Sequence, residues 1–252
     1  MAIRKGIYLF LILAIIFSSA GCYRTVTINE LTNDYTGLLG SKSLGDISLE
    51  KANKIRLSLC GITPNSSGTP TRSYFSDDII FAAGGTSYYF SRGLTDNSSL
   101  SLNFGQTGSH GKANSGYTAG LAFKKGLRAD SDGYYWMVAR VGYDYLKESL
   151  NSFYVEEGFR VENIELHQGT LEIILSQQNG RFKPFFSQQL GLASFSYQGG
   201  QSGSIVPSFN ELLMTAVGIE ITWDDWGIIL ASKFKTSSSG PCYTGLGAYK
   251  NL

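Results

Sequence analysis

The stretch GIEITWDDWGIILASKF, residues 218–234, carries alternating apolar residues on both sides of an acidic pair. Trp223 and Trp226 flank Asp224 and Asp225, and nearly every second residue running away from this centre is apolar. A period of two predicts β-strands with one apolar face. Two such runs joined by two residues predict a hairpin. Both tryptophans would lie on its outer face, where in water they would promote aggregation.

The same alternation recurs along the chain and predicts ten strands. They cover residues 53–62, 84–93, 98–105, 116–125, 133–146, 163–177, 181–197, 209–223, 226–235 and 242–250. The connections alternate between short turns and longer loops, as antiparallel neighbours that run up and down require. We therefore predict an all-β fold, an antiparallel up-and-down transmembrane barrel of about ten strands, with eight as the alternative.

The N-terminus predicts export from the cytoplasm. Two basic residues precede an apolar run at residues 6–17, which small residues follow. This is the pattern of a secretory signal peptide, residues 1–21, and the run is too short to span a bilayer. The ending Ser19 to Cys22 also resembles a bacterial lipobox, which makes Cys22 a candidate lipidation site beside ordinary cleavage after Ala20. Residues 22–52 are then expected to be a periplasmic lead-in and residues 53–252 the barrel domain.

Aromatic residues gather at the predicted strand ends. Trp223, Trp226, Tyr143 and Tyr145 are the leading examples. Aromatic side chains prefer the interface between lipid and water, so these ends predict contact with membrane lipid. A soluble periplasmic β-sandwich lipoprotein is the alternative, because its strands would alternate in the same way.

The opposite face of the strands carries the charged residues. We expect Arg140, Asp144, Glu172, Glu220 and Lys233 in the barrel interior, and with them Arg56, Lys124 and Lys183. Five of these eight side chains are basic and three acidic. Opposite charges in a narrow lumen are expected to pair and fill it, with Arg140 bound to Glu172 or Glu220. A filled interior argues against an open pore, and a narrow pore remains the alternative.

Two cysteines lie in the first and last predicted strands, at Cys60 and Cys242. These strands must pair if the barrel closes, so the two thiols could approach each other across the seam. Disulfides persist outside the cytoplasm, and the pair is therefore a candidate disulfide.

Composition and motifs point to no particular chemistry. The 252-residue chain has a formal net charge of +1, so we expect no nucleic acid partner. Neither His110 nor His167 stands in a metal-binding or catalytic spacing, and no cofactor motif is present in the sequence. We therefore expect no cofactor and no catalytic site.

Signal peptide, ten amphipathic strands, and alternating short turns and long loops together resemble the small outer-membrane β-barrel proteins of Gram-negative bacteria. The chain departs from that family in ending GLGAYKNL, without a terminal aromatic residue. The resemblance implies residence in the outer membrane and a structural or surface-interaction role through the outer loops, with a surface ligand left open. A pore or an outer-membrane enzyme is the alternative that the same family offers.

Overall fold

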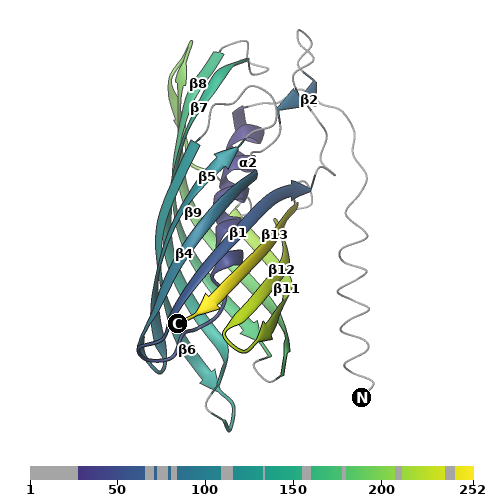
Figure 1. The fold of residues 1–252 in the computed structure, drawn as a ribbon. Coiled ribbons are helices and arrows are strands. Elements are labelled where there is room, and N and C mark those ends of the chain that lie inside the picture. The colour runs from purple at the N-terminus through teal and green to yellow at the C-terminus, as the bar shows by residue number, and fades with distance from the viewer. Residues whose placement is uncertain are drawn as a thin grey trace.

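A computed structural model describes residues 28–65, 71–72, 79–80, 84–108, 116–132, 134–154, 160–177, 180–207, 212–235 and 242–252. Ten long strands dominate it (Figure 1). They are β1 (Ile55–Asn65), β4 (Gly84–Thr95), β5 (Ser98–Gly108), β6 (Gly116–Ala129), β7 (Tyr135–Tyr154), β8 (Arg160–Ser176), β9 (Phe182–Gly199), β11 (Leu213–Trp223), β12 (Trp226–Lys235) and β13 (Cys242–Asn251). The remaining elements are the helix α2 (Ile28–Ser41), the 3-10 helix η1 (Lys42–Gly45) and the short strands β2 (Thr71–Arg72), β3 (Ile79–Ile80) and β10 (Gly203–Ile205).

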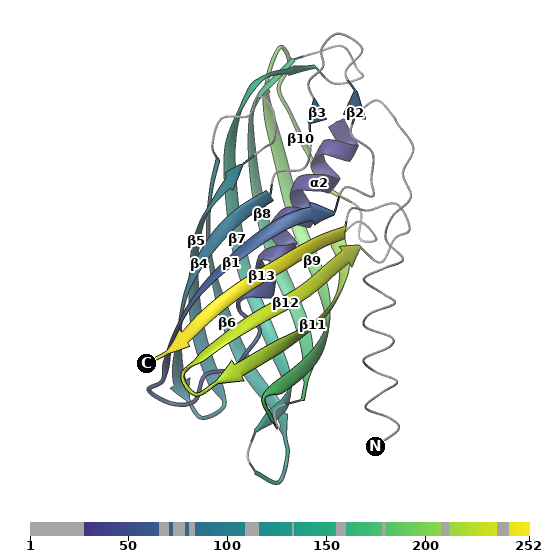
Figure 2. The ribbon, with the colours of Figure 1, turned by 45° about the vertical axis from the view of Figure 1, so that its right-hand side comes forward.

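The ten long strands close into one antiparallel barrel. Each pairs with the next long strand along the chain, and β13 pairs with β1 from Arg56↔Asn251 to Asn65↔Cys242. The views in Figures 1 and 2 show β1, β13, β12 and β11 side by side around the wall. This confirms the predicted up-and-down barrel of ten strands, and a single closed sheet excludes the two-sheet sandwich.

The hairpin of β11 and β12 has the geometry that its sequence predicts. Trp223 pairs with Trp226, and Asp224 has a positive φ of 46°, a conformation that aspartate tolerates in tight turns. The two indoles are 40% and 57% exposed on the outer face. Apart from Lys147, Arg160 and similar residues near the strand ends, the exposed outer face is largely apolar along the strands.

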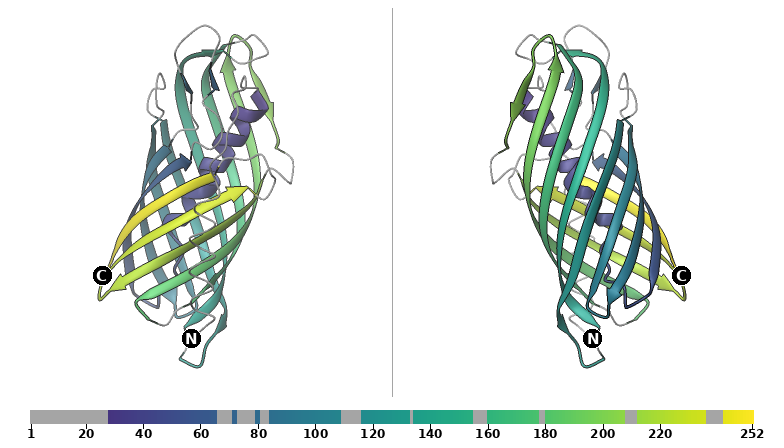
Figure 3. Two further views of the ribbon diagram at one scale, coloured as in Figure 1. Left: turned by 90° about the vertical axis from the view of Figure 1, so that its right-hand side faces the viewer. Right: turned by 90° about the vertical axis from the view of Figure 1, so that its left-hand side faces the viewer.

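The two ends of the barrel differ. The strand ends that flank the short connections β4–β5, β6–β7, β8–β9 and β11–β12 lie at one end together with the C-terminus, hereafter the turn end. The opposite end is hereafter the loop end. There β7, β8 and β9, with 20, 17 and 18 residues, rise above the shorter strands (Figure 3). They extend past the ends that the sequence predicts for them.

The segment before β1 lies inside the barrel rather than outside it. Figures 1 and 3 show α2 running along the lumen. Tyr35, Leu38 and Leu39 of α2 are at most 1% exposed, and Lys42 of η1 is fully buried. The expected periplasmic lead-in is therefore corrected for residues 28–50, which we call the plug. Among the described residues, no helix is both long and apolar enough to cross a membrane.

Candidate functional site: the plugged lumen

The plug enters at the loop end and leaves at the turn end. Lys235, the last residue of β12, donates from Nζ to Thr36 Oγ1 over 3.2 Å near the loop end. Further down, Tyr89 of β4 donates to the carbonyl oxygen of Lys42 over 2.6 Å. At the turn end Ala52 bridges to Gly93, shortly before β1 begins. The chain therefore descends through the whole lumen before the first strand of the wall starts.

An apolar cluster holds the loop-end half of the plug. Tyr35, Leu38 and Leu39 pack against inward side chains of the wall. The wall members include Leu146, Ile164, Leu166, Phe195, Leu212, Met214 and Tyr243. Burial of side chains of this size removes apolar surface from water, and each Å² of buried apolar surface stabilises the fold by about 25 cal/mol. Among the described residues, this half of the lumen is therefore a packed core around the helix.

Close approach explains one glycine of the helix. A Cβ at Gly37 would lie 2.6 Å from Cε2 of Tyr243, so the tyrosine ring or the helix would have to shift to make room for it. Glycine costs a helix interior about 1 kcal/mol relative to alanine, so its place in α2 reflects packing against the wall. The backbone of α2 at Gly37 therefore packs closely against Tyr243 of β13.

A short polar link lies between the apolar cluster and the wall. Tyr35 donates from its hydroxyl to Glu148 Oε1 over 3.1 Å, and Thr107 Oγ1 donates to the other carboxylate oxygen over 2.7 Å. Glu148 is 1% exposed. The buried carboxylate therefore has a hydroxyl donor on each oxygen, which offsets part of its desolvation.

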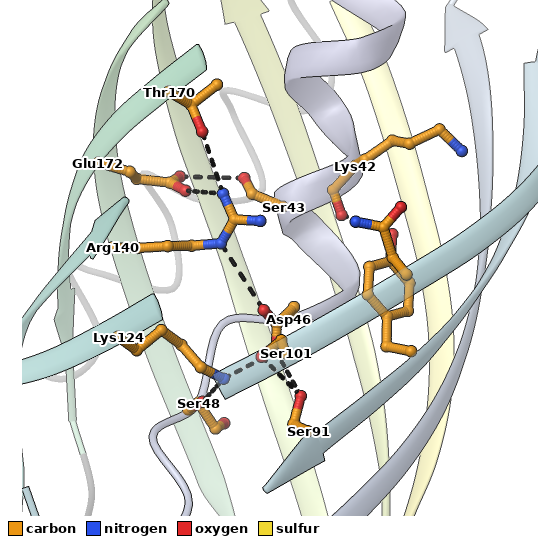
Figure 4. Close-up of polar contacts among 12 residues, drawn as sticks. Lys42, Ser43, Asp46, Ser48, Ser91, Ser101, Lys124, Arg140, Thr170 and Glu172 are labelled. Carbon is orange, nitrogen blue, oxygen red and sulfur yellow. Dashed lines mark hydrogen bonds and ion pairs between the residues drawn. The ribbon is translucent and has the colours of Figure 1, made fainter. Parts of the chain in front are cut away.

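The turn-end half of the plug is held by buried charges together with a second apolar cluster, in which Leu44 and Ile47 pack against the wall. Asp46 presents its carboxylate to the wall, where Lys124 Nζ lies 2.7 Å from Oδ1 (Figure 4). Ser91 and Ser101 donate to the same oxygen over 2.8 and 2.9 Å. Arg140 Nε is 3.7 Å from Oδ2. Both side chains of the closest pair, Lys124 and Asp46, are at most 1% exposed, so solvent does not screen their attraction.

A second carboxylate of the plug completes this contact. Glu50 lies 3.0 Å from Lys124 Nζ and 3.4 Å from Arg56 Nε. Arg56 also pairs with Glu220 of the wall over 3.5 Å. Ser48 of the plug donates to Glu220 over 2.6 Å. Plug and wall thus share one continuous set of ion pairs.

The wall carries the rest of the network. Glu172 accepts from Lys233 Nζ over 3.0 Å and lies 3.9 Å from Arg140 Nη1. Ser187 donates to Glu172 over 2.6 Å, and Ser43 of the plug donates to it over 3.2 Å. We call the eight side chains joined by these pairs the ionic network. Its members are Arg56, Lys124, Arg140, Lys233, Glu172 and Glu220 of the wall and Asp46 and Glu50 of the plug.

The structure brings together four of the five interior charges singled out in the sequence. Arg140, Glu172, Glu220 and Lys233 belong to the ionic network, whereas Asp144 accepts a hydrogen bond from Asn103 over 2.9 Å. Arg140 contacts Glu172 but no contact joins it to Glu220 among the described pairs. Sequence reasoning missed Asp46 and Glu50, although the excess of basic residues on the inner face was a signal that acids from elsewhere must enter.

The aromatic residues singled out in the sequence lie on the outer wall. Tyr143 is 43% exposed, and its hydroxyl is 2.6 Å from His167 Nδ1. Tyr145 donates to Glu165 over 2.5 Å. His167 therefore stands on the outer surface, and His110 lies outside the described residues. Cys22 lies outside them as well.

The cysteines do not form the candidate disulfide. Among the described residues, Cys60 and Cys242 are both thiols. The seam itself is present, but its register sets Cys60 opposite Gly247 and Cys242 opposite Asn65. Five residues along a strand exceed the roughly 7 Å that a disulfide can bridge between Cα atoms. Cys60 also points into the lumen, where it is fully buried.

No family model matches the sequence, and no curated protein matches it. Solved structures of membrane barrels resemble it weakly. The N-terminal β-barrel domain of Pseudomonas aeruginosa OprF is 12% identical, with a TM-score of 0.33, over 81% of this chain and all of that one. The translocator domain of the autotransporter NalP from Neisseria meningitidis is 12% identical, with a TM-score of 0.41, over 84% and 92%. Neisserial surface protein A is 10% identical, with a TM-score of 0.33, over 79% and 95%.

The fold assignment rests on the strand pairing of the chain itself. One closed antiparallel barrel, apolar outside and polar or plugged inside, is the architecture of the outer-membrane β-barrel proteins. The chain has this architecture.

Proposed function

We propose that the protein is an outer-membrane barrel with a closed interior, acting as a structural or surface-interaction protein through its loop end. The observation that carries the proposal is the plug. The loop-end half of the plug is packed in an apolar cluster, and its turn-end half is bound by buried ion pairs. A lumen occupied along its length by its own chain is unsuited to steady conduction.

The outer face supports placement in a membrane. Large apolar side chains are exposed on every long strand, among them Leu59, Phe104, Leu121, Leu192 and Leu246. An apolar band around a closed barrel is stable in lipid and prone to aggregation in water. We infer membrane lipid as the partner of this face. Residues 1–21 would supply the export signal, and acylation at Cys22 would add an anchor.

The loop end supports a surface role. Above Tyr145 the outward residues of β7 change to Lys147 and Ser149, and β9 carries Ser194 and Ser196 outward above Leu192. The tall strands therefore continue beyond the apolar band with a polar surface. A polar wall above the lipid is available for contact with another molecule outside the cell.

Conductance tests the closed interior. Purified protein that migrates as a heat-modifiable folded band is added to a planar lipid bilayer in potassium chloride. We expect no stepwise conductance from the unmodified protein. Steady open channels would overturn the closed interior and favour the narrow pore.

Labelling in intact cells tests the orientation. Both variants carry serine in place of Cys22, Cys60 and Cys242. Gln201→Cys then places a thiol at the loop end, and Asp225→Cys places a matched exposed thiol in the turn between β11 and β12. A membrane-impermeant maleimide should label the first variant and spare the second until the outer membrane is permeabilised. Labelling of the second variant alone would invert the proposed orientation.

A further inference from the structure

Four neighbouring strands each point one polar group at the carboxylate of Asp46. Ser91 comes from β4, Ser101 from β5, Lys124 from β6 and Arg140 from β7. Two hydroxyl donors and two cations around one carboxylate form a binding site for an oxyanion. The site belongs to the wall, and only its occupant belongs to the plug.

The occupant does not satisfy the site completely. Arg140 Nε and Asp46 Oδ2 are both buried without a hydrogen bond, because 3.7 Å separates them. Arg140 is 1% exposed, so this donor is desolvated and aimed at the carboxylate. An unpaired buried donor costs about 1–3 kcal/mol, which an anion seated closer to Arg140 would recover.

The charge of the wall points to the same ligand. Within the ionic network, the wall contributes four cations and two acids, and the plug contributes the two remaining acids. Asp144 of the wall also lies near Arg140, so without Asp46 and Glu50 the four buried cations of the wall would face three acids, which leaves one uncompensated positive charge in a narrow space. Basic side chains lining a constriction select for anions.

The two halves of the plug are held differently. The helix α2 is packed in the apolar cluster of the loop-end half. The chain after η1 has no helix from Asp46 to Glu50, and there Ile47 packs in a second apolar cluster with the wall beside the ion pairs of Asp46 and Glu50 and the hydrogen bond of Ser48. An anion that reaches these buried pairs would compete with the carboxylates of the plug for the same cations. The turn-end half is therefore where an anion can compete with the plug for the cations of the wall.

We propose that the wall of the lumen holds a binding site for small oxyanions, of the carboxylate or phosphate class. Asp46 is its built-in occupant, and withdrawal of the whole plug from the lumen, α2 included, exposes an anion-selective passage. The proposal rests on the closed lumen of the proposed function.

Neutralising the plug tests this proposal. Asp46→Asn with Glu50→Gln keeps side-chain size and removes both charges. In a bilayer with a potassium chloride gradient, this double variant should open to channels whose reversal potential shifts to the anion side. The matched control, Glu162→Gln with Asp225→Asn, removes two exposed acids outside the ionic network and should stay closed.

The outcomes separate the two proposals. Steady conduction by the unmodified protein would overturn the closed lumen. A silent unmodified protein with a double variant that stays closed, or that opens toward cations, would overturn the oxyanion site alone.

Chemical rescue covers a double variant that does not refold. Asp46→Gly vacates the site while the four wall groups remain. Refolding with sodium formate should restore the heat-modifiable band, whereas neutral formamide at the same concentration should not. Equal yields with the two additives would overturn the site.

Discussion

At the scale of single residues, Arg140 links the wall of the barrel to its plug. The guanidinium is 1% exposed and lies between Asp46 and Glu172, with Thr170 accepting from Nη1 over 3.4 Å. Both carboxylates are buried, so water cannot solvate either of them if the guanidinium is removed. Removing the cation leaves two buried acids undercompensated, and a loss of this kind costs about 3–5 kcal/mol.

Arg140→Ala should therefore lower the free energy of unfolding by about 3 kcal/mol or more. The matched control is Arg160→Ala, because the Arg160–Glu162 pair has a length of 3.0 Å but is about 45% exposed. An exposed pair contributes about 0–1 kcal/mol. Thermal unfolding followed by the loss of the folded gel band measures both variants. Equal shifts would contradict a charge-bound plug.

A methyl group at Gly37 gives a second test at this scale. In a free helix Gly37→Ala would be stabilising by about 1 kcal/mol. Inside the barrel the new Cβ would meet Tyr243 at 2.6 Å, and overpacking costs about 1–3 kcal/mol. We expect a lower midpoint of thermal unfolding. Gly169→Ala is the control, since its Cβ would meet only Leu192 O at 3.9 Å. A higher midpoint for Gly37→Ala would contradict the packing of α2 against β13.

At the scale of elements, the hairpin of β11 and β12 defines where the lipid should end. In Trp136→Phe, Trp223 and Trp226 are the remaining tryptophans of the three in the chain. If both lie at the interface, lipids brominated near the headgroup should quench the fluorescence more than lipids brominated at the chain ends. Quenching by aqueous iodide in place of either lipid would contradict the placement of this hairpin.

The strands were predictable because their signal is local. A period of two is set by the pleat, so alternation in β4 or β12 shows both the strand and its two faces. The loop-end extensions of β7, β8 and β9 were not predictable from the sequence. Beyond the apolar band the outward residues become polar, so apolar and polar residues no longer alternate there.

The plug could not be predicted as a helix from its own residues. The α2 sequence, INELTNDYTGLLGS, contains two glycines, two threonines and two asparagines, which are weak helix formers. Packing against the wall stabilises it, and that contact is remote in sequence. Only the wall residues of the ionic network were predictable. The sequence shows the excess of basic residues on the inner face of the wall, but it does not show that Asp46 and Glu50 of the plug enter the lumen.

At the scale of the whole molecule, the order of the chain shapes the assembly. The plug precedes β1, and the seam of β1 and β13 joins the first strand of the wall to the last. The closed barrel therefore encloses the segment that directly precedes its first strand. Plug and wall are one core, and the stability of each depends on the other.

A cross-link between plug and wall tests this most directly. A Cβ built at Gly245 of β13 lies 3.3 Å from Leu44 Cβ of η1, close to the spacing of about 3.8 Å in a disulfide. The test variant is Leu44→Cys with Gly245→Cys, with Cys22→Ser, Cys60→Ala and Cys242→Ala to remove the three native thiols. In the control, Leu246→Cys replaces Gly245→Cys, because Leu246 is 60% exposed on the outer face.

After mild oxidation of the folded barrel, mass spectrometry of a non-reduced tryptic digest reads out the link. The account predicts that the peptide of residues 43–51 is joined to the peptide of residues 236–250 in the Gly245→Cys variant and is unlinked in the Leu246→Cys control. An unlinked Gly245→Cys variant, or a link to the outward Leu246→Cys instead, would contradict a plug inside the barrel.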